Sequence, residues 1–129
     1  MSSLSRLLAL TASVLLAIGV QLGALGAHAL RSILTPDQLN SWALAVQYQL
    51  IHGLGILLIV LLGRWIGPSR WLNWAGGVML AGIFLFSGSI YMALLGPRWF
   101  GMVAPLGGTS FMVAWLLLAV AIWKHKANP

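Results

Sequence analysis

The charged residues of this chain divide it into long stretches that carry no charge at all. Only eight charged side chains occur among the 129 residues, namely Arg6, Arg31, Asp37, Arg64, Arg70, Arg98, Lys124 and Lys126. Between them lie four charge-free spans, residues 7–30, 38–63, 71–97 and 99–123, each 24 to 27 residues long. A helix rises 1.5 Å per residue, so about 20 apolar residues cross a hydrocarbon core about 30 Å thick. The sequence therefore predicts an all-α fold, a four-transmembrane-helix bundle.

The four spans account for nearly the whole chain. We expect a single integral membrane domain over residues 1–129, with helices at about 7–29, 38–62, 72–95 and 105–123. The composition, 60% hydrophobic and 6% charged, leaves too little polar surface for a separate soluble domain. A net charge of +6 would favour nucleic acid in a soluble protein, but here the cations stand at helix ends, where they meet lipid headgroups. The expected partner is the lipid bilayer, and nucleic acid is not.

The cations are shared unequally between the two ends of the predicted helices. If the helices alternate in direction, both termini and the second loop lie on one side with five cations, and the other side carries two cations and Asp37. Loops rich in Lys and Arg stay in the cytoplasm, so we expect both termini to be cytoplasmic. A cleavable signal peptide is the alternative for the first span, with the triplet Ala27-His28-Ala29 as its cleavage site. The length of the span favours a retained helix.

Two local patterns predict how the first helices begin and pack. Gly19, Gly23 and Gly26 fall on one side of the first helix and form a small-residue stripe, which lets two helix backbones approach closely in a membrane. The run TPDQ at residues 35–38 is typical of a helix start, with a capping threonine, a proline at the first position and a glutamine that completes a capping box. Trp42 follows soon after, and we expect it at the depth of the lipid headgroups.

Polar residues inside the predicted helices gather in the half that lies away from the termini. Eight of them form a candidate pocket or polar cluster: His28, Gln47, Tyr48, His52, Ser87, Ser89, Tyr91 and Thr109. Gln21, Gln49 and Ser110 lie at a similar depth. Tyr48 and His52 are four residues apart and share a helix face, which His28 is expected to approach from the first helix. Such a cluster fastens helices together by hydrogen bonds, or lines a pocket open to the outer leaflet, and the sequence leaves both interpretations open.

The reactive chemistry available to this cluster is sparse. The chain has no cysteine, and its one carboxylate lies outside the charge-free spans, so we expect no metal site and no cofactor. Haem held between His28 and His52 is conceivable but poorly supported by so few ligands. No carboxylate is available to orient a histidine for catalysis, so we expect the protein not to be an enzyme. Small multidrug exporters have a similar size but depend on an intramembrane carboxylate, which this chain lacks.

Four ordered motifs resemble the small bacterial membrane proteins catalogued as "domain of unknown function 423". They read GALGAHAL at residues 23–30, WALAVQYQLIH at 42–52, LFSGSIY at 85–91 and APLGGTSF at 104–111. Ala29 is a departure, because glycine is more usual there. The resemblance covers essentially the whole chain and implies a multi-pass protein of the bacterial inner (cytoplasmic) membrane. It implies no particular activity.

Three functions remain open at the level of the sequence. The favoured one is a non-enzymatic packing, assembly or accessory subunit, which would join a second copy of itself or a larger membrane protein complex. The small-residue stripe and the scarcity of reactive groups favour it. The alternatives are a membrane protein that binds a small molecule, lipid or quinone in the polar pocket, and an oligomeric transporter or channel.

Overall fold

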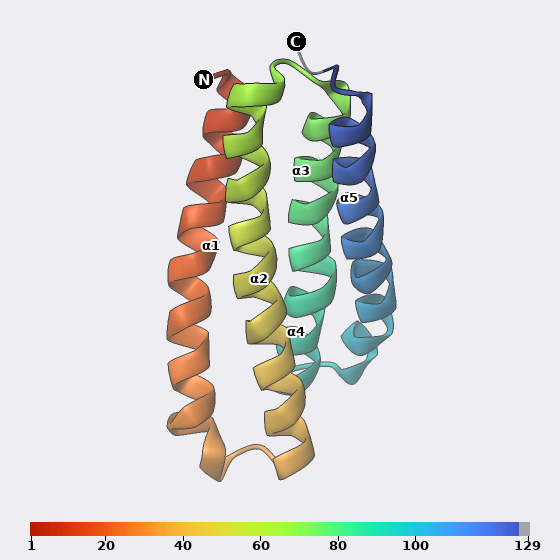
Figure 1. The fold of residues 1–129 in the computed structure, drawn as a ribbon. Helices are drawn as coiled ribbons and strands as arrows, with labels where there is room; N and C mark the ends of the chain where they lie inside the picture. Colours follow the sequence, from red (N-terminus) through yellow and green to blue (C-terminus); the bar gives the residue numbers. More distant parts are fainter. Residues whose placement is uncertain (127–129) are drawn as a thin grey trace.

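Each charge-free span of the sequence corresponds to one long helical rod, and only Gly96 and Pro97 of the third span lie beyond the end of theirs (Figure 1). The computed structural model describes residues 1–126, which contain the helices α1 (Ser3–Ala27), α2 (Pro36–Ile66), α3 (Arg70–Ile83), α4 (Ser89–Leu95) and α5 (Ala104–Lys124). A π-helical turn, Phe84–Gly88, joins α3 to α4 in a single rod. Short 3-10 helices, Ala29–Ser32 and Arg98–Val103, follow α1 and precede α5. Four rods are long and apolar enough to cross a membrane, and residues 1–126 contain no strand, so the predicted fold is confirmed.

The observed helices run past several predicted boundaries, because a charged residue marks the membrane surface and not the end of a helix. α1 begins at Ser3, four residues before the predicted start, and the side chain of Ser2 accepts a hydrogen bond of 3.1 Å from the backbone N–H of Ser5. α2 continues to Ile66 and ends where Gly67 adopts a φ of 83°. That angle is costly for residues with a side chain. The Thr35 capping box is present as predicted.

The four rods form two hairpins that meet along α2 and α3 (Figure 1). α1 packs mainly on α2, and α5 packs mainly on α3, while α2 also contacts α3 and α4. Both ends of the described chain lie at the same end of the bundle, where α2 also turns into α3. The other end carries the α1–α2 and α4–α5 connections, and the α1–α2 hairpin reaches further in that direction.

Glycines allow α1 and α2 to pack closely along most of their length. A Cβ atom on Gly26 would lie 2.6 Å from the ring of Trp42, and one on Gly19 would lie 2.8 Å from Cδ2 of Leu50. Gly23 faces α2 between these two contacts. Carbon atoms prefer separations of about 3.5–4.0 Å, so side chains at the first two positions would force the helices apart. The small-residue stripe of α1 therefore faces α2 of the same chain, with Gly19 buried and Gly23 and Gly26 partly exposed beside the contact.

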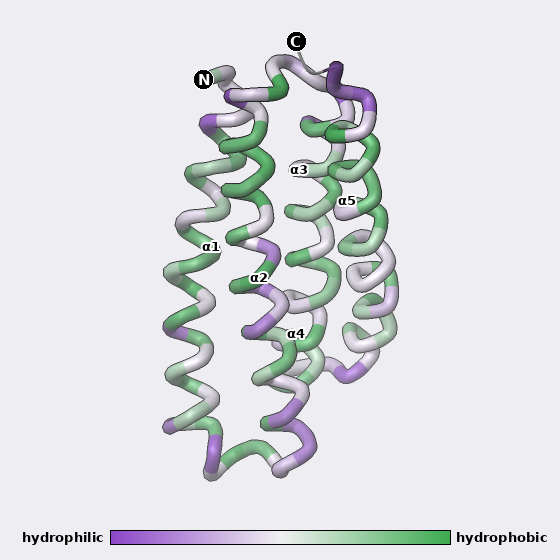
Figure 2. The backbone as a smooth tube through the Cα atoms, viewed as in Figure 1, coloured by the Kyte–Doolittle hydropathy of each residue, from purple (hydrophilic) through white to green (hydrophobic). Residues whose placement is uncertain are grey.

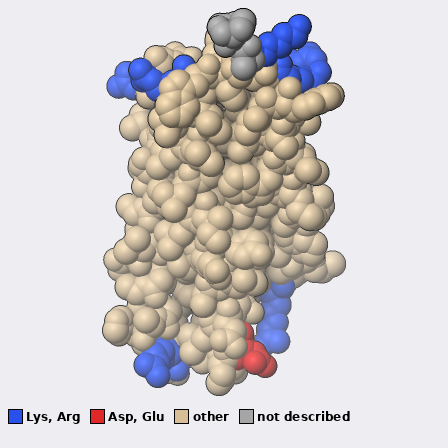
Figure 3. All heavy atoms as spheres, in the orientation of Figure 1, with Lys and Arg blue, Asp and Glu red and all other residues tan. Residues whose placement is uncertain are grey.

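Charge and hydropathy separate along the bundle axis. Lys and Arg side chains lie at both ends, with Asp37 at the end opposite the termini, and a broad uncharged belt lies between (Figure 3). Hydrophobic residues dominate this belt, except for a polar stretch near the middle of α2 (Figure 2). The core of the half nearer the termini is apolar and includes Leu8, Ala12, Ile56, Ile59, Leu72, Ala75, Met79, Leu118 and Ala121. The polar stretch of α2 is therefore the part of the interior in which to look for a site.

Candidate functional site

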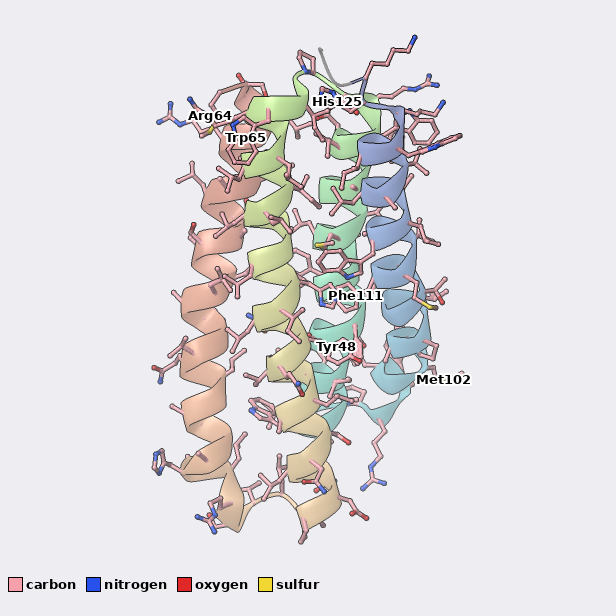
Figure 4. All side chains as sticks on the ribbon, viewed as in Figure 1. Tyr48, Arg64, Trp65, Met102, Phe111 and His125 are labelled. Atoms are coloured by element: carbon pink, nitrogen blue, oxygen red, sulfur yellow. The ribbon has the colours of Figure 1, made fainter. Side chains whose placement is uncertain are left out.

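In the half of the bundle away from the termini, the polar residues form two groups that lie next to each other on the buried side of α2. The first, the His52 cluster, consists of Tyr48, His52, Phe86, Phe111 and Trp115. The second, the Gln49 network, consists of Trp42, Gln49 and Tyr91 with two backbone carbonyls of α1. Tyr48 and Phe111 point into the space between α2 and α5 (Figure 4). In place of the single polar pocket expected from the sequence there are thus two clusters with different partners, aromatic rings around His52 and a hydrogen-bonded network around Gln49.

Aromatic rings enclose His52 on the side that faces α5. The imidazole stacks on the Phe111 ring with centroids 3.6 Å apart and planes 12° apart. Tyr48, one turn earlier on α2, stacks on Phe86 with centroids 4.8 Å apart. Trp115 closes the cluster from α5, with its ring centroid 5.7 Å from that of His52. His52 is only 5% exposed, so the cluster is filled by its own rings and leaves no room beside the imidazole for a ligand.

Both nitrogens of His52 have hydrogen-bond partners, and these partners fix its tautomer. Nε2 lies 3.0 Å from Nε1 of Trp115, and Nδ1 lies 2.8 Å from the carbonyl oxygen of Tyr48. An indole N–H can only donate and a carbonyl can only accept. Nε2 must therefore be without hydrogen, and Nδ1 must carry it. The imidazole has no free nitrogen for a metal ion, a haem iron or a proton relay.

The side-chain amide of Gln49 joins three helices. Nε2 donates a hydrogen bond of 2.7 Å to the carbonyl oxygen of Leu15 on α1, and Oε1 accepts one of 2.7 Å from the hydroxyl of Tyr91 on α4. Gln49 is 2% exposed. The Leu15 carbonyl is accessible because the residue one turn further along α1 is Gly19, which has no side chain to cover it. The glycine therefore permits both close packing and an interhelical hydrogen bond.

Trp42 repeats the same arrangement seven residues earlier on α2. Its Nε1–H donates a hydrogen bond of 2.8 Å to the carbonyl oxygen of Leu22, which is left open by Gly26 one turn further along α1. Its ring lies against that of Tyr91, with centroids 4.7 Å apart. Trp42 is 2% exposed, so its indole is packed inside the bundle and does not lie on its surface. The indole N–H of Trp42 is therefore bonded to a buried carbonyl, and its ring occupies the space that Gly26 leaves open.

The π-helical turn brings α5 against the α3–α4 rod. Ser87, within Phe84–Gly88, is fully buried and donates a hydrogen bond of 2.6 Å to the carbonyl oxygen of Ala45 on α2. On the opposite side, a Cβ atom on Gly107 of α5 would overlap the backbone nitrogen of Phe86. A π turn is wider than an α turn and often occurs at functional positions in helices. Here it carries a hydrogen bond to α2 and receives the backbone of α5.

Two predicted site residues lie away from both groups. His28 is exposed at the C-terminal end of α1, beside the start of α2. His52 lies 16 residues into α2 from Pro36, roughly 24 Å along the helix axis, so the expected approach of His28 to His52 does not occur. Gln47 is exposed on the outer surface of α2 and makes no hydrogen bond within residues 1–126.

Two further predicted residues bond to their own helix. The hydroxyl of Ser89 donates to the carbonyl oxygens of Leu85 and Phe86, at 2.6 and 2.9 Å. The hydroxyl of Thr109 donates to the carbonyl oxygen of Pro105 at 2.9 Å, and Thr109 is exposed. These are local bonds of the kind that serine and threonine commonly form in helices, and they connect no helices.

The structure adds Trp42, Gln49, Phe111 and Trp115 to the residues predicted from the sequence. Trp42 and Gln49 share one face of α2 with Ala45 and His52, because the spacing between them alternates between three and four residues. The same spacing can be read from the sequence and would have placed Trp42 and Gln49 on the face of His52. Phe111 and Trp115 stand in an apolar helix, and no pattern within α5 marks them as partners of a histidine.

Hollow surfaces occur at two other places. A cavity of about 390 Å³ lies at the end that holds the termini and is lined by residues of α1, α2 and α3, including Ser5, Arg64 and Asn73. A groove of about 430 Å³ lies on the surface between α1 and α2, in the half of the bundle away from the termini, and is lined by Gly23, Gly26, Ala27, Leu39, Trp42, Ala43, Val46, Gln47 and Leu50. Neither hollow contains the His52 cluster.

The buried polar side chains of the described residues all form hydrogen bonds within the chain. Residues 1–126 contain no buried side-chain nitrogen or oxygen atom without a hydrogen-bond partner. They also contain no group of three or more histidine, cysteine, aspartate or glutamate side chains that could hold a metal ion. The hydrogen bonds of Gln49, Ser87, Trp42 and Trp115 fasten neighbouring helices together.

Comparison with known proteins places these features in one family. The family model described as "Protein of unknown function (DUF423)" matches residues 22–108. That stretch includes Gly23 and Gly26 of α1, all of α2 and the π-helical turn, and it reaches Gly107.

Curated relatives cover nearly the whole chain. A "UPF0382 membrane protein" of Staphylococcus epidermidis is 40% identical over 113 residues, which are 87% of this chain and 89% of that protein. The "UPF0382 membrane protein YwdK" of Bacillus subtilis (strain 168) is 37% identical over 114 residues, 88% of this chain and 91% of that protein. A relative of Staphylococcus saprophyticus is 39% identical over 113 residues, with coverages of 87% and 91%. No solved structure matches the chain.

Proposed function

The chain belongs to the membrane protein family described as "Protein of unknown function (DUF423)", and from that premise we propose that it is a small non-enzymatic assembly module of the bacterial cytoplasmic membrane. In this role its four helices form a stable unit whose outer surface associates with other transmembrane helices. The function lies in that surface, because the interior is committed to holding the unit together.

One observation carries the proposal: every buried side-chain nitrogen and oxygen atom of residues 1–126 has a hydrogen-bond partner within the chain. His52, Gln49 and Ser87 each bond to a neighbouring helix or to an aromatic partner on one. Interhelical hydrogen bonds in membranes contribute about 0.6–2 kcal/mol each, enough to fix helices in one arrangement. A transporter or an enzyme would need polar groups left free for a substrate.

Orientation and location follow the charge distribution. The end that holds the termini carries Arg6, Arg64, Arg70, Lys124 and Lys126, and Asp37 lies at the other end. Under the positive-inside rule this end faces the cytoplasm. The protein then presents the α1–α2 hairpin on the outer side of the membrane.

A second candidate function, binding of an anionic lipid headgroup, is favoured by the cavity at the cationic end. Arg64, Asn73 and Ser5 line this cavity of about 390 Å³, and the end of the bundle around it carries no carboxylate within residues 1–126. Basic pockets between transmembrane helices on the cytoplasmic side bind phosphate-bearing headgroups. This candidate replaces the earlier one of a quinone or lipid pocket around His52, because aromatic rings fill that space.

Native mass spectrometry after gentle extraction from the source membrane distinguishes the assembly module from the lipid-binding protein. A stoichiometric complex with protein subunits, either a second copy or another membrane protein, is the result expected for an assembly module. A monomer that retains one phospholipid, and loses it when Arg64 is replaced with glutamine, would support the second candidate. A monomer that retains a different small molecule would refute both.

A further inference from the structure

We infer that α2 carries a dimerisation seam through which two copies of this chain associate in parallel, with the Gln47 side chains of the two copies hydrogen-bonded to each other. The inference rests on the proposed assembly function and names the partner as a second copy. It is carried by the lipid-facing side of α2, which the core does not use.

The lipid-facing side of α2 bears a regular row of large side chains. We call this row the α2 stripe, and its members are Leu44, Gln47, Ile51, Leu54, Leu58 and Leu61. Their spacing alternates between three and four residues, which is the repeat of a left-handed coiled-coil seam. All five aliphatic members are at least 42% exposed. The row extends over 18 residues, and the 17 steps between its ends rise roughly 26 Å, so it crosses most of the hydrocarbon layer.

Gln47 is the polar member of the α2 stripe, whose other five members are aliphatic. It lies 16 residues before Gly63, roughly 24 Å along the axis from the cationic end, and therefore inside a hydrocarbon core about 30 Å thick. Its amide is exposed and has no hydrogen-bond partner among residues 1–126. An unpaired polar group in lipid is unfavourable, so this side chain requires a partner from outside the chain.

A second copy of the chain supplies that partner, because its own Gln47 lies at the same depth. A carboxamide is both a donor and an acceptor, so two of them can pair reciprocally. Two copies inserted the same way up are related by a two-fold axis along the membrane normal, which brings the same residue of each to the same depth. An unrelated helix would need a polar side chain placed independently at that depth. One polar residue in an otherwise apolar seam also fixes its register.

The surface next to Gln47 is hollowed. The groove of about 430 Å³ between α1 and α2 includes Gln47 and is floored by Gly23, Gly26 and Ala43. Small residues let a neighbouring helix approach closely in a membrane. Large aliphatic side chains of the second copy would fill this groove, while those of the stripe would enter the equivalent groove opposite. α1 also exposes one glutamine, Gln21, but no hollow of this kind includes it.

Cysteine cross-linking of the full chain in lipid vesicles tests the seam directly, because the chain contains no cysteine of its own. Single variants Ile51→Cys and Leu58→Cys lie on the stripe, and the controls Val14→Cys and Leu116→Cys are similarly exposed on α1 and α5. Copper phenanthroline with oxygen oxidises two thiols to one disulfide, which forms only if their Cα atoms approach within about 7 Å. We expect covalent dimers from the two stripe variants and none from the controls at high lipid-to-protein ratio.

Energy transfer between labelled copies in the same vesicles measures the strength of the association. Gln47→Leu should weaken dimerisation roughly 3- to 30-fold, since an interhelical hydrogen bond in a membrane contributes about 0.6–2 kcal/mol. Gln21→Leu, the matched control at similar depth on α1, should leave the dissociation constant unchanged. Both variants should retain the circular dichroism and thermal unfolding of the unaltered chain, because neither side chain bonds within it.

The remaining outcomes distinguish this inference from the function on which it rests. Dimers cross-linked through Val14→Cys or Leu116→Cys, or equal effects of the two glutamine changes, would overturn the α2 seam while leaving an assembly function in place. No energy transfer for any variant, together with a monomeric mass for the extracted protein, would refute the seam and the assembly function together.

Discussion

Replacing Gly107 with alanine is expected to push α5 away from the π-helical turn. The added Cβ would overlap the backbone nitrogen of Phe86 and would lie 2.6 Å from the carbonyl carbon of Leu85. These are backbone atoms of an adjacent helix, so no rotation of a side chain can make room. The adjacent Gly108 is the matched control, because a Cβ there would meet nothing within 4 Å.

The contact distances set the size of the effect. Carbon atoms pack at about 3.5–4.0 Å, so α5 must move outward by about 1 Å at this point, and a gap of that size removes a quarter to a half of the dispersion energy across it. Overpacking of this kind costs about 1–3 kcal/mol, and we expect the upper end because the backbone is rigid. Alanine returns about 1 kcal/mol of helix propensity. The net loss for Gly107→Ala is about 2 kcal/mol, whereas Gly108→Ala should gain up to about 1 kcal/mol.

Unfolding by sodium dodecyl sulfate in mixed micelles, followed by circular dichroism, gives the free energy of unfolding for both variants. Tryptophan fluorescence supplies an independent readout, since Trp115 of α5 is hydrogen-bonded to His52 at 3.0 Å and a shift of 1 Å would break that bond. Equal stability of the two alanine variants, or an unchanged fluorescence spectrum for Gly107→Ala, would refute the close backbone approach.

Two further predictions test the hydrogen bonds around α2. Gln49→Leu and Tyr91→Phe should each destabilise the protein, and the double variant should be less destabilised than their sum by about 0.6–1.7 kcal/mol, as measured in a double-mutant cycle; additive effects would show that the two side chains are not coupled. Trp115→Phe should cost about 1–3 kcal/mol of unfolding free energy because it leaves Nε2 of His52 buried without a donor. The control Trp123→Phe, at a side chain 82% exposed, should change the unfolding midpoint little.

The number and approximate position of the membrane helices could be predicted from the sequence because the bilayer imposes them. Hydrocarbon excludes charge, and its thickness fixes the minimum length of an apolar helix. Local bonds within one segment could also be predicted, as the Thr35 and Gln38 capping box demonstrates. Such features depend only on the solvent or on residues a few positions apart.

The candidate site could be predicted only in part, because it depends on which helices become neighbours. Trp42 has the position of an interfacial tryptophan, yet its indole is buried against a carbonyl of α1 that Gly26 uncovers. His28 and His52 were both expected in the half of the bundle away from the termini, yet roughly 24 Å of α2 separates them along the axis. Depth in the membrane could be inferred from sequence position, but the direction in which each side chain points could not.

Gln47 and Gln49 illustrate the same limit most simply. They are two residues apart at almost the same depth, and as residue types they are identical. The rotation of α2 places one amide in the core between α1 and α4 and the other on the lipid-facing surface. Their different roles, an internal fastening and a proposed contact between copies, follow from an angle of about 200° around one helix.

The wide turn at Phe84–Gly88 has a consequence for insertions and deletions in this family of chains. One residue advances an α-helix by about 100° of rotation, so an extra residue in a turn resets the phase of every position beyond it. Deleting one residue from this segment would rebuild an uninterrupted α-helix and swing Tyr91 from Gln49 toward the acyl chains. A single-residue change of length here would therefore redirect the whole of α4.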